Sequence, residues 1–163
     1  MANGILNLTK VENQSILTNV TEYNLSEQIR LTVLLLESKW TARNINMNID
    51  FGEYTINANE EMMKQVWINL LDNAIKFSPE GEEISIRISN KNEHIYVSIS
   101  GKGPHIEDEE INKIFRKFYQ SDSSHSTEGT GIGLALVSRI IELHKGRIEV
   151  NSDKNINTFT VIL

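Results

Sequence analysis

The sequence predicts an α+β fold, a two-layer sandwich in which three helices cover one face of a mixed, mostly antiparallel sheet. Helical segments alternate with pairs of strands along the chain, and the strands show strict two-residue alternation of apolar side chains. The apolar residues of each predicted helix gather on one face, as they do in a helix that packs against a sheet. The 163 residues are enough for one domain with its own hydrophobic core.

The composition excludes several classes of protein. Hydrophobic residues make up 39% and charged residues 23% of the chain, a balance typical of a globular domain. The net charge of −6 argues against nucleic-acid binding, which needs a basic surface. Cysteine is absent, so disulfides, thiolate zinc sites and a cysteine nucleophile are excluded. No apolar run is long enough to span a bilayer, and we expect a cytoplasmic location.

The first segments predict a helical end, an edge strand and a long helix. The spacing of apolar residues over 5–11 is typical of the end of a helix, and 16–23 is expected to form an edge strand. Asn24 is a good N-cap, and Glu27 completes a capping box. The helix that follows is predicted to continue to about residue 43, with an apolar stripe of Ile29, Val33, Leu34 and Trp40.

A strand pair and a second helix come next. Residues 45–51 alternate strictly between apolar and polar, which predicts a half-buried strand, and 54–58 is expected to pair back onto it. Asn59 caps the second helix, which ends near Pro79. Its predicted buried face consists of Met63, Val66, Trp67, Leu70, Leu71 and Ala74.

The second half predicts two hairpins separated by a lid and a helix. Alternation marks strands around 84–88 and 95–99. The polar, glycine-containing segment 101–131, with a short helix over 111–119, is typical of a functional lid.

A third helix over 132–144 is expected to end with Gly146 at the C′ position. Two strands, 147–151 and 158–163, complete the chain.

Asn69, Asn73 and Lys76 lie at i, i+4 and i+7 in the second helix and therefore share one face. An amide oxygen is a suitable ligand for Mg²⁺, and an ammonium group pairs with phosphate. By itself this pattern is more typical of a solvated polar face.

Gly129, Gly131 and Gly133 alternate directly before the third helix. Exposed N–H groups at a helix start favour an anion such as phosphate. A preceding strand, required by the dinucleotide fingerprint, is missing, and so is the Gly-Lys-Ser/Thr of a P-loop. The alternative interpretation is a flexible linker that leads into a helix.

Together with a turn over 100–106, these stretches resemble the N, G1 and G2 boxes of the GHKL ATPase superfamily. Their order and spacing are similar to those of a bacterial sensor histidine kinase. Residues 69–78 resemble the N box, 114–119 the F box and 129–136 the G2 box, and 144–150 resemble the segment after it. The resemblance runs from about residue 24 to the end.

The resemblance implies a Bergerat-type sandwich with ATP between the N-box helix and the lid. Asn73 would be the Mg²⁺ ligand, Asn69 and Lys76 would lie near the phosphates, and these three would form the catalytic set. Phe115 and Phe118 would anchor the lid. The implied nucleotide-binding residues are Asn69, Asn73, Lys76, Gly101, Gly103, Ile106, Phe115, Phe118, Tyr119, Gly129, Thr130, Gly131, Ile132, Gly133 and Leu134.

The G1 box departs from the family pattern of Asp-x-Gly-x-Gly. Gly101 stands where the family has the aspartate that accepts a hydrogen bond from the adenine amine, and His105 stands at the second glycine. Loss of a charged hydrogen-bond partner costs about 1.5–3 kcal/mol, roughly 10- to 150-fold in affinity. His105 is expected either to close part of the pocket or to turn into solvent. Gln120 and the run 155–158 also depart from the pattern.

The phosphate-accepting histidine of the family has no equivalent here, because none of the four histidines lies in the required motif. We therefore interpret 1–15 as the remnant of an upstream dimerisation helix or as a tag, and 16–163 as the catalytic domain. The implied partners are a histidine-containing dimerisation domain of the same protein and a response regulator. The parent protein is expected to be dimeric and membrane-associated.

Two other interpretations stay open at this point. A degenerate, non-catalytic module would keep the fold for protein contacts, as Gly101 and His105 suggest. A serine kinase of the anti-sigma-factor type uses the same fold without a dimerisation helix, but the helical end within 5–15 argues against it.

Overall fold

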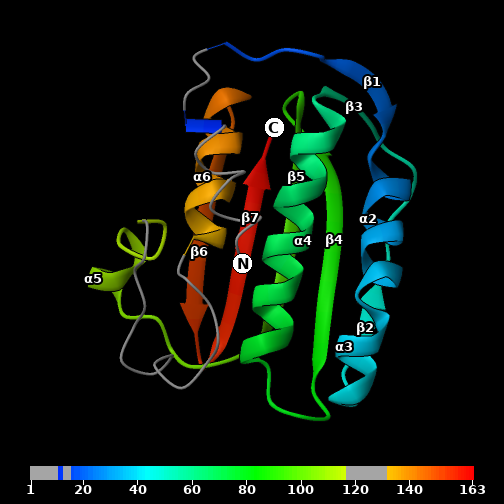
Figure 1. Cartoon of the computed structure of the whole chain (residues 1–163). Coiled ribbons are helices and arrows are strands. Elements are labelled where there is room, and N and C mark those ends of the chain that lie inside the picture. Colours follow the sequence, from blue (N-terminus) through cyan, green and yellow to red (C-terminus); the bar gives the residue numbers. More distant parts are fainter. Residues whose placement is uncertain (1–10, 13–15, 117–131) are drawn as a thin grey trace.

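A five-stranded sheet lies behind three helices in the computed structural model, which describes residues 11–12, 16–116 and 132–163 (Figure 1). The strands of the sheet are β2 (Asn46–Ile49), β4 (Glu83–Lys91), β5 (His94–Lys102), β7 (Ile156–Ile162) and β6 (Arg147–Asp153), in that spatial order. β2 runs parallel to β4, and the other neighbours are antiparallel. The predicted fold class, a mixed and mostly antiparallel sheet, is confirmed.

The covering helices are α2 (Leu25–Leu35), α4 (Glu60–Phe77) and α6 (Gly133–Leu143). They lie side by side on one face of the sheet, and α6 runs antiparallel to α4 (Figure 1). Two short helices, α3 (Glu37–Ala42) and α5 (Asp108–Ile111), are also present, and residues 11–12 are helical. No helix in the described part of the chain is both long and apolar enough to cross a membrane.

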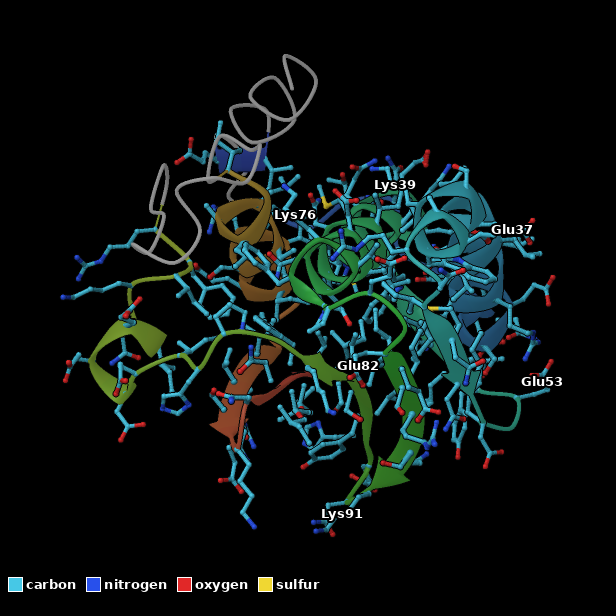
Figure 2. The ribbon with its side chains drawn as sticks, turned by 90° about the horizontal axis from the view of Figure 1, so that it is seen from below. Glu37, Lys39, Glu53, Lys76, Glu82 and Lys91 are labelled. Atoms are coloured by element: carbon cyan, nitrogen blue, oxygen red, sulfur yellow. The ribbon has the colours of Figure 1, made fainter. Side chains whose placement is uncertain are left out.

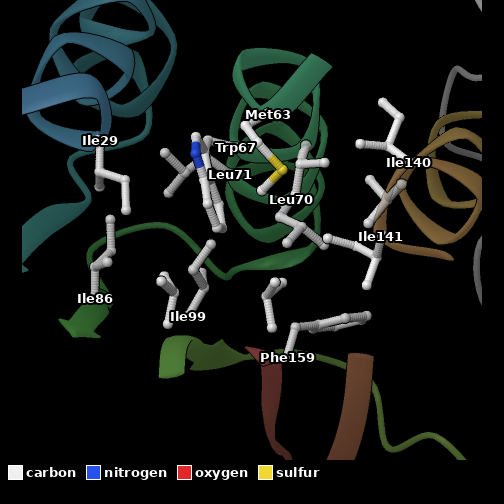
Figure 3. Packing of buried hydrophobic residues seen from close by; sticks show 14 of the residues in the cluster. Ile29, Met63, Trp67, Leu70, Leu71, Ile86, Ile99, Ile140, Ile141 and Phe159 are labelled. Carbon is white, nitrogen blue, oxygen red and sulfur yellow. The ribbon is translucent and has the colours of Figure 1, made fainter. Parts of the chain in front are cut away.

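The core lies between α4 and the sheet. Trp67, Leu70 and Leu71 of α4 point down onto β4, β5 and β7, where Ile86, Ile99 and Phe159 meet them (Figure 3). Each fully buried side chain of this kind contributes about 1.5–3 kcal/mol of transfer free energy. Ala74, predicted for this face, is only half-buried, and Ile75 is buried instead because it lies nearer the centre of the apolar stripe.

The predicted pairing of 54–58 with 45–51 is wrong. β3 (Thr55–Ala58) pairs antiparallel with β1 (Thr21–Asn24) in a separate two-stranded sheet, with Thr21 opposite Ala58. β2 instead lies at the edge of the main sheet beside β4. Alternation indicates a strand but carries no information on its partner, which here comes from a distant part of the chain. The first strand is therefore shorter than 16–23 and does not join the main sheet.

The long helix predicted over 24–43 is two helices. The backbone changes direction at Leu36, which has φ −98° and ψ 11°, so α3 starts a new axis. Leu34, predicted to be buried, is 60% exposed, and Leu36 is buried instead. A residue one position past Val33 lies 100° further round the helix, which takes Leu34 out of the buried stripe.

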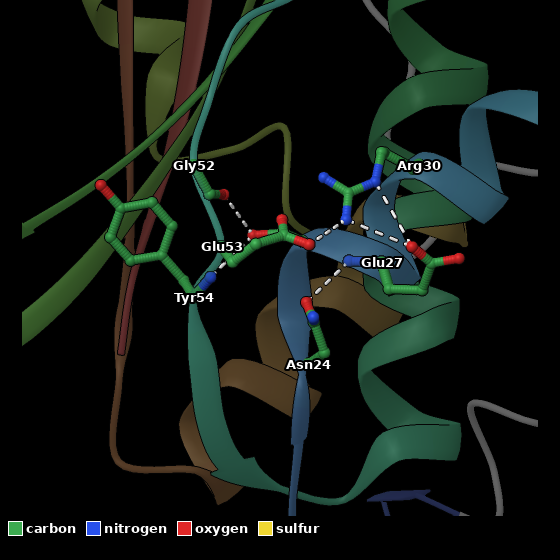
Figure 4. Close-up of polar contacts among 7 residues, drawn as sticks. Asn24, Glu27, Arg30, Gly52, Glu53 and Tyr54 are labelled. Atoms are coloured by element: carbon green, nitrogen blue, oxygen red, sulfur yellow. Dashed lines mark hydrogen bonds and ion pairs between the residues drawn. The ribbon is translucent and has the colours of Figure 1, made fainter.

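Polar contacts fix the start of α2 to the turn that leads into β3 (Figure 4). Asn24 caps the helix, since its Oδ1 accepts the Glu27 N–H at 2.9 Å, as predicted. Arg30 donates to Glu53 at 2.6 Å and to Glu27 at 3.2 Å. Its guanidinium lowers the pKa of the Glu53 carboxyl. The Ser26 hydroxyl donates to the Gly52 carbonyl at 2.7 Å.

Two further predictions, on the end of α6 and on the position of α5, are wrong. Lys145, with φ 58°, occupies the left-handed C′ position that was predicted for Gly146. The Gly146 N–H then bonds to the Ile141 carbonyl at 3.0 Å, as the C″ residue of a Schellman motif does. The helix predicted over 111–119 is shifted, because α5 ends at Ile111 and turns follow to residue 116. Of the helical end predicted over 5–11, only Val11 is described, and it is buried.

Candidate functional site

The second half of α4 presents Asn69, Asn73 and Lys76, and all three are half-buried. The helix begins at Asn59, whose Oδ1 accepts the Met62 N–H at 3.0 Å, and it ends because Ser78 is extended before Pro79. Since its apolar stripe packs on the sheet, the amides and the lysine lie along the remaining surface. Lys76 stands at the end of the molecule that Figure 2 views face on.

Asn69 meets the start of α6. Its Nδ2 donates to the Gln65 carbonyl at 2.7 Å. A Cβ at Gly133 would lie 2.9 Å from Asn69 Oδ1, so glycine is what allows the two helices to approach here. The segment that resembles the N box and the one that resembles the G2 box therefore meet at Asn69 and Gly133, which are 64 positions apart in the chain.

The start of α6 provides backbone donors. Its N-cap residue Ile132 is buried, with 2% of its surface exposed, and α6 has no side-chain cap among the described residues. Uncapped N–H groups at the positive end of a helix dipole attract anions. Leu134 is half-buried and packs against the core, so it holds this first turn in place.

The end of β5 brings the predicted turn over 100–106, which resembles the G1 box, close to the end of α4. A Cβ at Gly103 would lie 3.1 Å from Asn157 Nδ2 and 3.4 Å from the Phe77 carbonyl oxygen. Gly101 lies opposite Asn157 in the sheet, and its Cβ would lie 3.3 Å from Ile84 Cγ1. Gly103 thus permits close packing of the strand end against α4, while Gly101 offers no side-chain acceptor.

The segment after β5 is tied to the turn between β6 and β7. The Ile106 N–H donates to Ser152 Oγ at 3.0 Å, and Asn157 Nδ2 donates to the Pro104 carbonyl at 3.0 Å. Ser152 Oγ in turn donates to Asn157 Oδ1 at 2.6 Å. Sequence reasoning missed Ser152 altogether and treated Asn157 only as a departure from the family turn. Polar residues in place of turn glycines were the available signal.

His105 is held against β6. Its Nδ1 lies 3.0 Å from Ser152 Oγ, whose single proton already goes to Asn157, so His105 Nδ1 is the donor. Its Nε2 lies 3.9 Å from the Glu107 carboxylate, and 42% of the side chain is exposed. The ring is thus partly exposed and bound to β6 rather than free in solvent, and the expectation that it closes part of the pocket stays a prediction.

Phe115 anchors the first part of the predicted lid. Its ring meets Phe159 of β7 edge to face, with centroids 6.4 Å apart. Ile106 and Ile114 also pack partly against the core. The remaining predicted residues of the lid and of the glycine run lie outside the described residues: Phe118, Tyr119, Gly129, Thr130 and Gly131.

Two ion pairs lie near these motifs, and a cleft lies elsewhere on the surface. Lys102 pairs with Glu82 at 3.3 Å, and Lys39 pairs with Asp72 of α4 at 2.8 Å. In the described ranges, no three His, Asp or Glu side chains gather as a metal site. A cleft of about 850 Å³ lies on the far side of α6 from α4, between Phe115, Ile141 and β6. It does not include the predicted site residues of α4.

Comparison with known proteins assigns this arrangement to a family. The profile described as "Histidine kinase-, DNA gyrase B-, and HSP90-like ATPase" matches residues 58–163. The sensor histidine kinase CusS of Escherichia coli O6:H1 is 28% identical over 165 residues, covering all of this chain and 34% of CusS. The adaptive-response sensory kinase SasA of Prochlorococcus marinus is 39% identical over 140 residues, which cover 83% of this chain and 37% of SasA. The chain thus spans about a third of the length of these relatives.

Solved structures agree with this assignment. The catalytic domain of the histidine kinase ThkA matches with a TM-score of 0.81 at 32% identity, covering 90% of this chain and 95% of that domain. ThkA in complex with the response regulator protein TrrA matches with a TM-score of 0.83 at 27% identity, covering 99% of this chain and 46% of ThkA.

Proposed function

We propose that this chain, which belongs to the family of histidine kinase-, DNA gyrase B- and HSP90-like ATPases as an ATP-binding catalytic domain of the sensor histidine kinase type, holds ATP with Mg²⁺ between α4 and the start of α6. We propose further that it transfers the γ-phosphoryl group to a histidine on a separate domain. The observation that carries the proposal is the approach of Asn69 Oδ1 to the backbone at Gly133.

The residues of α4 suit a metal–phosphate group. Asn73 presents an amide from the same face as Asn69, and its oxygen is a hard ligand of the kind that Mg²⁺ takes. Lys76 adds a cation one turn further on. When bound, Mg²⁺ neutralises charge on the phosphate oxygens. The protein's own part is to position the phosphates by the α6 N–H groups and the α4 side chains.

The acceptor histidine is proposed to come from another domain. His94 stands exposed at the β4–β5 hairpin, and both ring nitrogens of His144 are engaged in hydrogen bonds. His105 is bound to Ser152, and His125 lies outside the described residues. We place the acceptor on a dimerisation domain and the next acceptor on a response regulator, as the complex of ThkA with TrrA suggests for its own chain. The proposed location is the cytoplasm, within a membrane-associated, dimeric parent protein.

A degenerate module is the second candidate, and Gly101 is the observation that favours it. The position has no side chain to accept a hydrogen bond from a base, and Ile84 Cγ1 would lie 3.3 Å from a Cβ there. Ile84 is fully buried, so an aspartate at 101 would require a small shift of the core. Such a module would bind nucleotide weakly or not at all.

Calorimetric titration of ATP and Mg²⁺ into the whole chain tests the proposal. We expect binding, with the affinity of Asn73→Ala lowered about tenfold in the presence of Mg²⁺ and much less in EDTA. Asn90→Ala is the matched control, since Asn90 is exposed at the far end of β4. Unchanged affinity in Asn73→Ala would refute the site. No binding by the folded wild-type chain would favour the degenerate module.

A further inference from the structure

The C-terminal end of α6 and the N-terminal end of α4 are joined by one histidine. His144 Nδ1 lies 2.8 Å from the Ile140 carbonyl, and the Asn59 backbone N–H lies 3.1 Å from His144 Nε2. A carbonyl only accepts and a backbone N–H only donates, so Nδ1 carries the proton and Nε2 is the acceptor. The neutral ring in this one tautomer satisfies both partners.

Asn59 connects this histidine to a third part of the chain. Its N–H donates to His144, its Oδ1 accepts from the Met62 N–H, and its Nδ2 donates to the Thr18 carbonyl at 2.9 Å. Asn59 is only 7% exposed, so water replaces these bonds poorly. The segment 16–20, which leads into β1, is thereby bonded to the start of α4, which His144 joins to α6.

We propose that His144 is a proton-sensitive latch that holds α6 and the segment 16–20 to the start of α4. A second proton on the ring turns Nε2 into a donor that faces the Asn59 N–H, and two donors repel. The hydrogen bond between α6 and α4 then breaks, and Asn59 loses the partner that orients it toward Thr18. Because α6 also forms the Asn69–Gly133 contact at its other end, the latch reaches the site proposed above.

The surroundings of His144 favour the neutral ring. Burial lowers its pKa, and the hydrogen bond to the Ile140 carbonyl opposes this shift. The charged side chains on the elements around it are exposed: Glu142 and Lys145 beside it, Glu60 and Glu61 in the first turn of α4, and Glu22 in β1. The positive end of the α4 dipole disfavours an imidazolium, whereas the C-terminal end of α6, where His144 is the C-cap, favours one. The latch is therefore closed near neutral pH and opens on acidification.

Nuclear magnetic resonance on the whole chain without nucleotide tests the latch directly. We expect the ring ¹⁵N shifts of His144 to report a proton on Nδ1 near pH 7.5. On acidification, the exchange protection of the Asn59 amide should fall about tenfold as His144 titrates, after correction for intrinsic rates. A proton on Nε2, or Asn59 protection that ignores the titration, would overturn the latch.

Two variants provide the controls. His144→Gln keeps an acceptor but cannot titrate, so the protection of Asn59 should become independent of pH. His94→Gln removes an exposed histidine and should leave the pH dependence of wild type. The same pH dependence of Asn59 protection in His144→Gln and in wild type would overturn the proposal. If His144→Gln does not fold, the tautomer of His144 and the pH dependence of Asn59 protection in wild type test the proposal. The effect of the latch on the nucleotide site rests on the proposed function. The tautomer of His144 and the exchange protection of Asn59 are measured without nucleotide, so a failure of the latch is distinguished from a failure of the proposed function.

Discussion

The two sides of the candidate site are held together by different physics. Along α6 the packing is close: a Cβ would lie 2.9 Å from the Asn69 side chain at Gly133, beside the site, and 2.5 Å from the Ile162 backbone carbonyl at Gly146, at the far end of the helix. On the β6–β7 side, side-chain hydrogen bonds of Ser152 and Asn157 hold the segment that follows β5. Close packing leaves no room for a methyl group, whereas a partly exposed hydrogen bond is readily replaced by water. The α6 side should therefore be the more sensitive to substitution.

The largest effect is expected from Gly146→Ala. A Cβ at this position would lie 2.5 Å from the Ile162 backbone carbonyl, which cannot move without disturbing β7. We expect the free energy of unfolding to fall by about 1–3 kcal/mol, measured by urea denaturation. Gly52→Ala is the control, because nothing lies within 4 Å of a Cβ there. Equal stability of the two variants would show that the end of α6 adapts more easily than its packing indicates.

Gly133→Ala should act on nucleotide affinity more than on stability. The atom in the way is the end of the Asn69 side chain, which can turn aside at the loss of its bond to Gln65. We expect affinity for ATP and Mg²⁺ to fall about tenfold, with a smaller loss of stability than in Gly146→Ala. Calorimetry and urea unfolding on the same sample separate the two effects. Unchanged affinity would remove Asn69 from the proposed site.

Asn157→Ala tests the other side. It removes the bonds to Ser152 and Pro104, both of them partly exposed, so the loss of stability should be about 1 kcal/mol or less. Hydrogen exchange should show lower protection at Ile106, whose N–H depends on Ser152. Asn151→Ala, at an exposed position of β6, serves as the matched control. A loss as large as that of Gly146→Ala would contradict the distinction between the two sides.

The smallest effect is expected from pH. Burial lowers the pKa of His144 below its ordinary value of 6.5, so the unfolded chain takes up the proton first as the pH falls. The neutral ring contributes fully to the free energy of unfolding above pH 6.5. This contribution is lost as the pH falls from 6.5 through the lower pKa of the folded state. Urea unfolding of wild type and His144→Gln at about pH 7.5 and 5.5 should show a steeper decline in wild type. Parallel declines would assign the pH dependence to other groups.

Local signals explain which parts of the fold were predictable. Asn24 and Asn59 cap helices as predicted, because a cap depends only on the three residues that follow it. Asn69 lies beside Gly133, and Gly103 lies beside Phe77 at the end of α4, while the role of these residues in nucleotide binding stays a prediction. Leu34 and the length of its helix were predicted wrongly, since a bend at Leu36 leaves no trace in apolar periodicity.

The sequence by itself determined the fold class, the helices and strands of the sandwich, and the family motifs, because periodicity, caps and motifs are properties of neighbouring residues. Only the tertiary structure decided that β3 pairs with β1, that Ser152 and Asn157 hold the segment after β5, and that Asn59 meets His144. These contacts join residues 31 to 85 positions apart. Which distant groups meet depends on how whole elements pack, and hydrogen-bond partners follow from that packing.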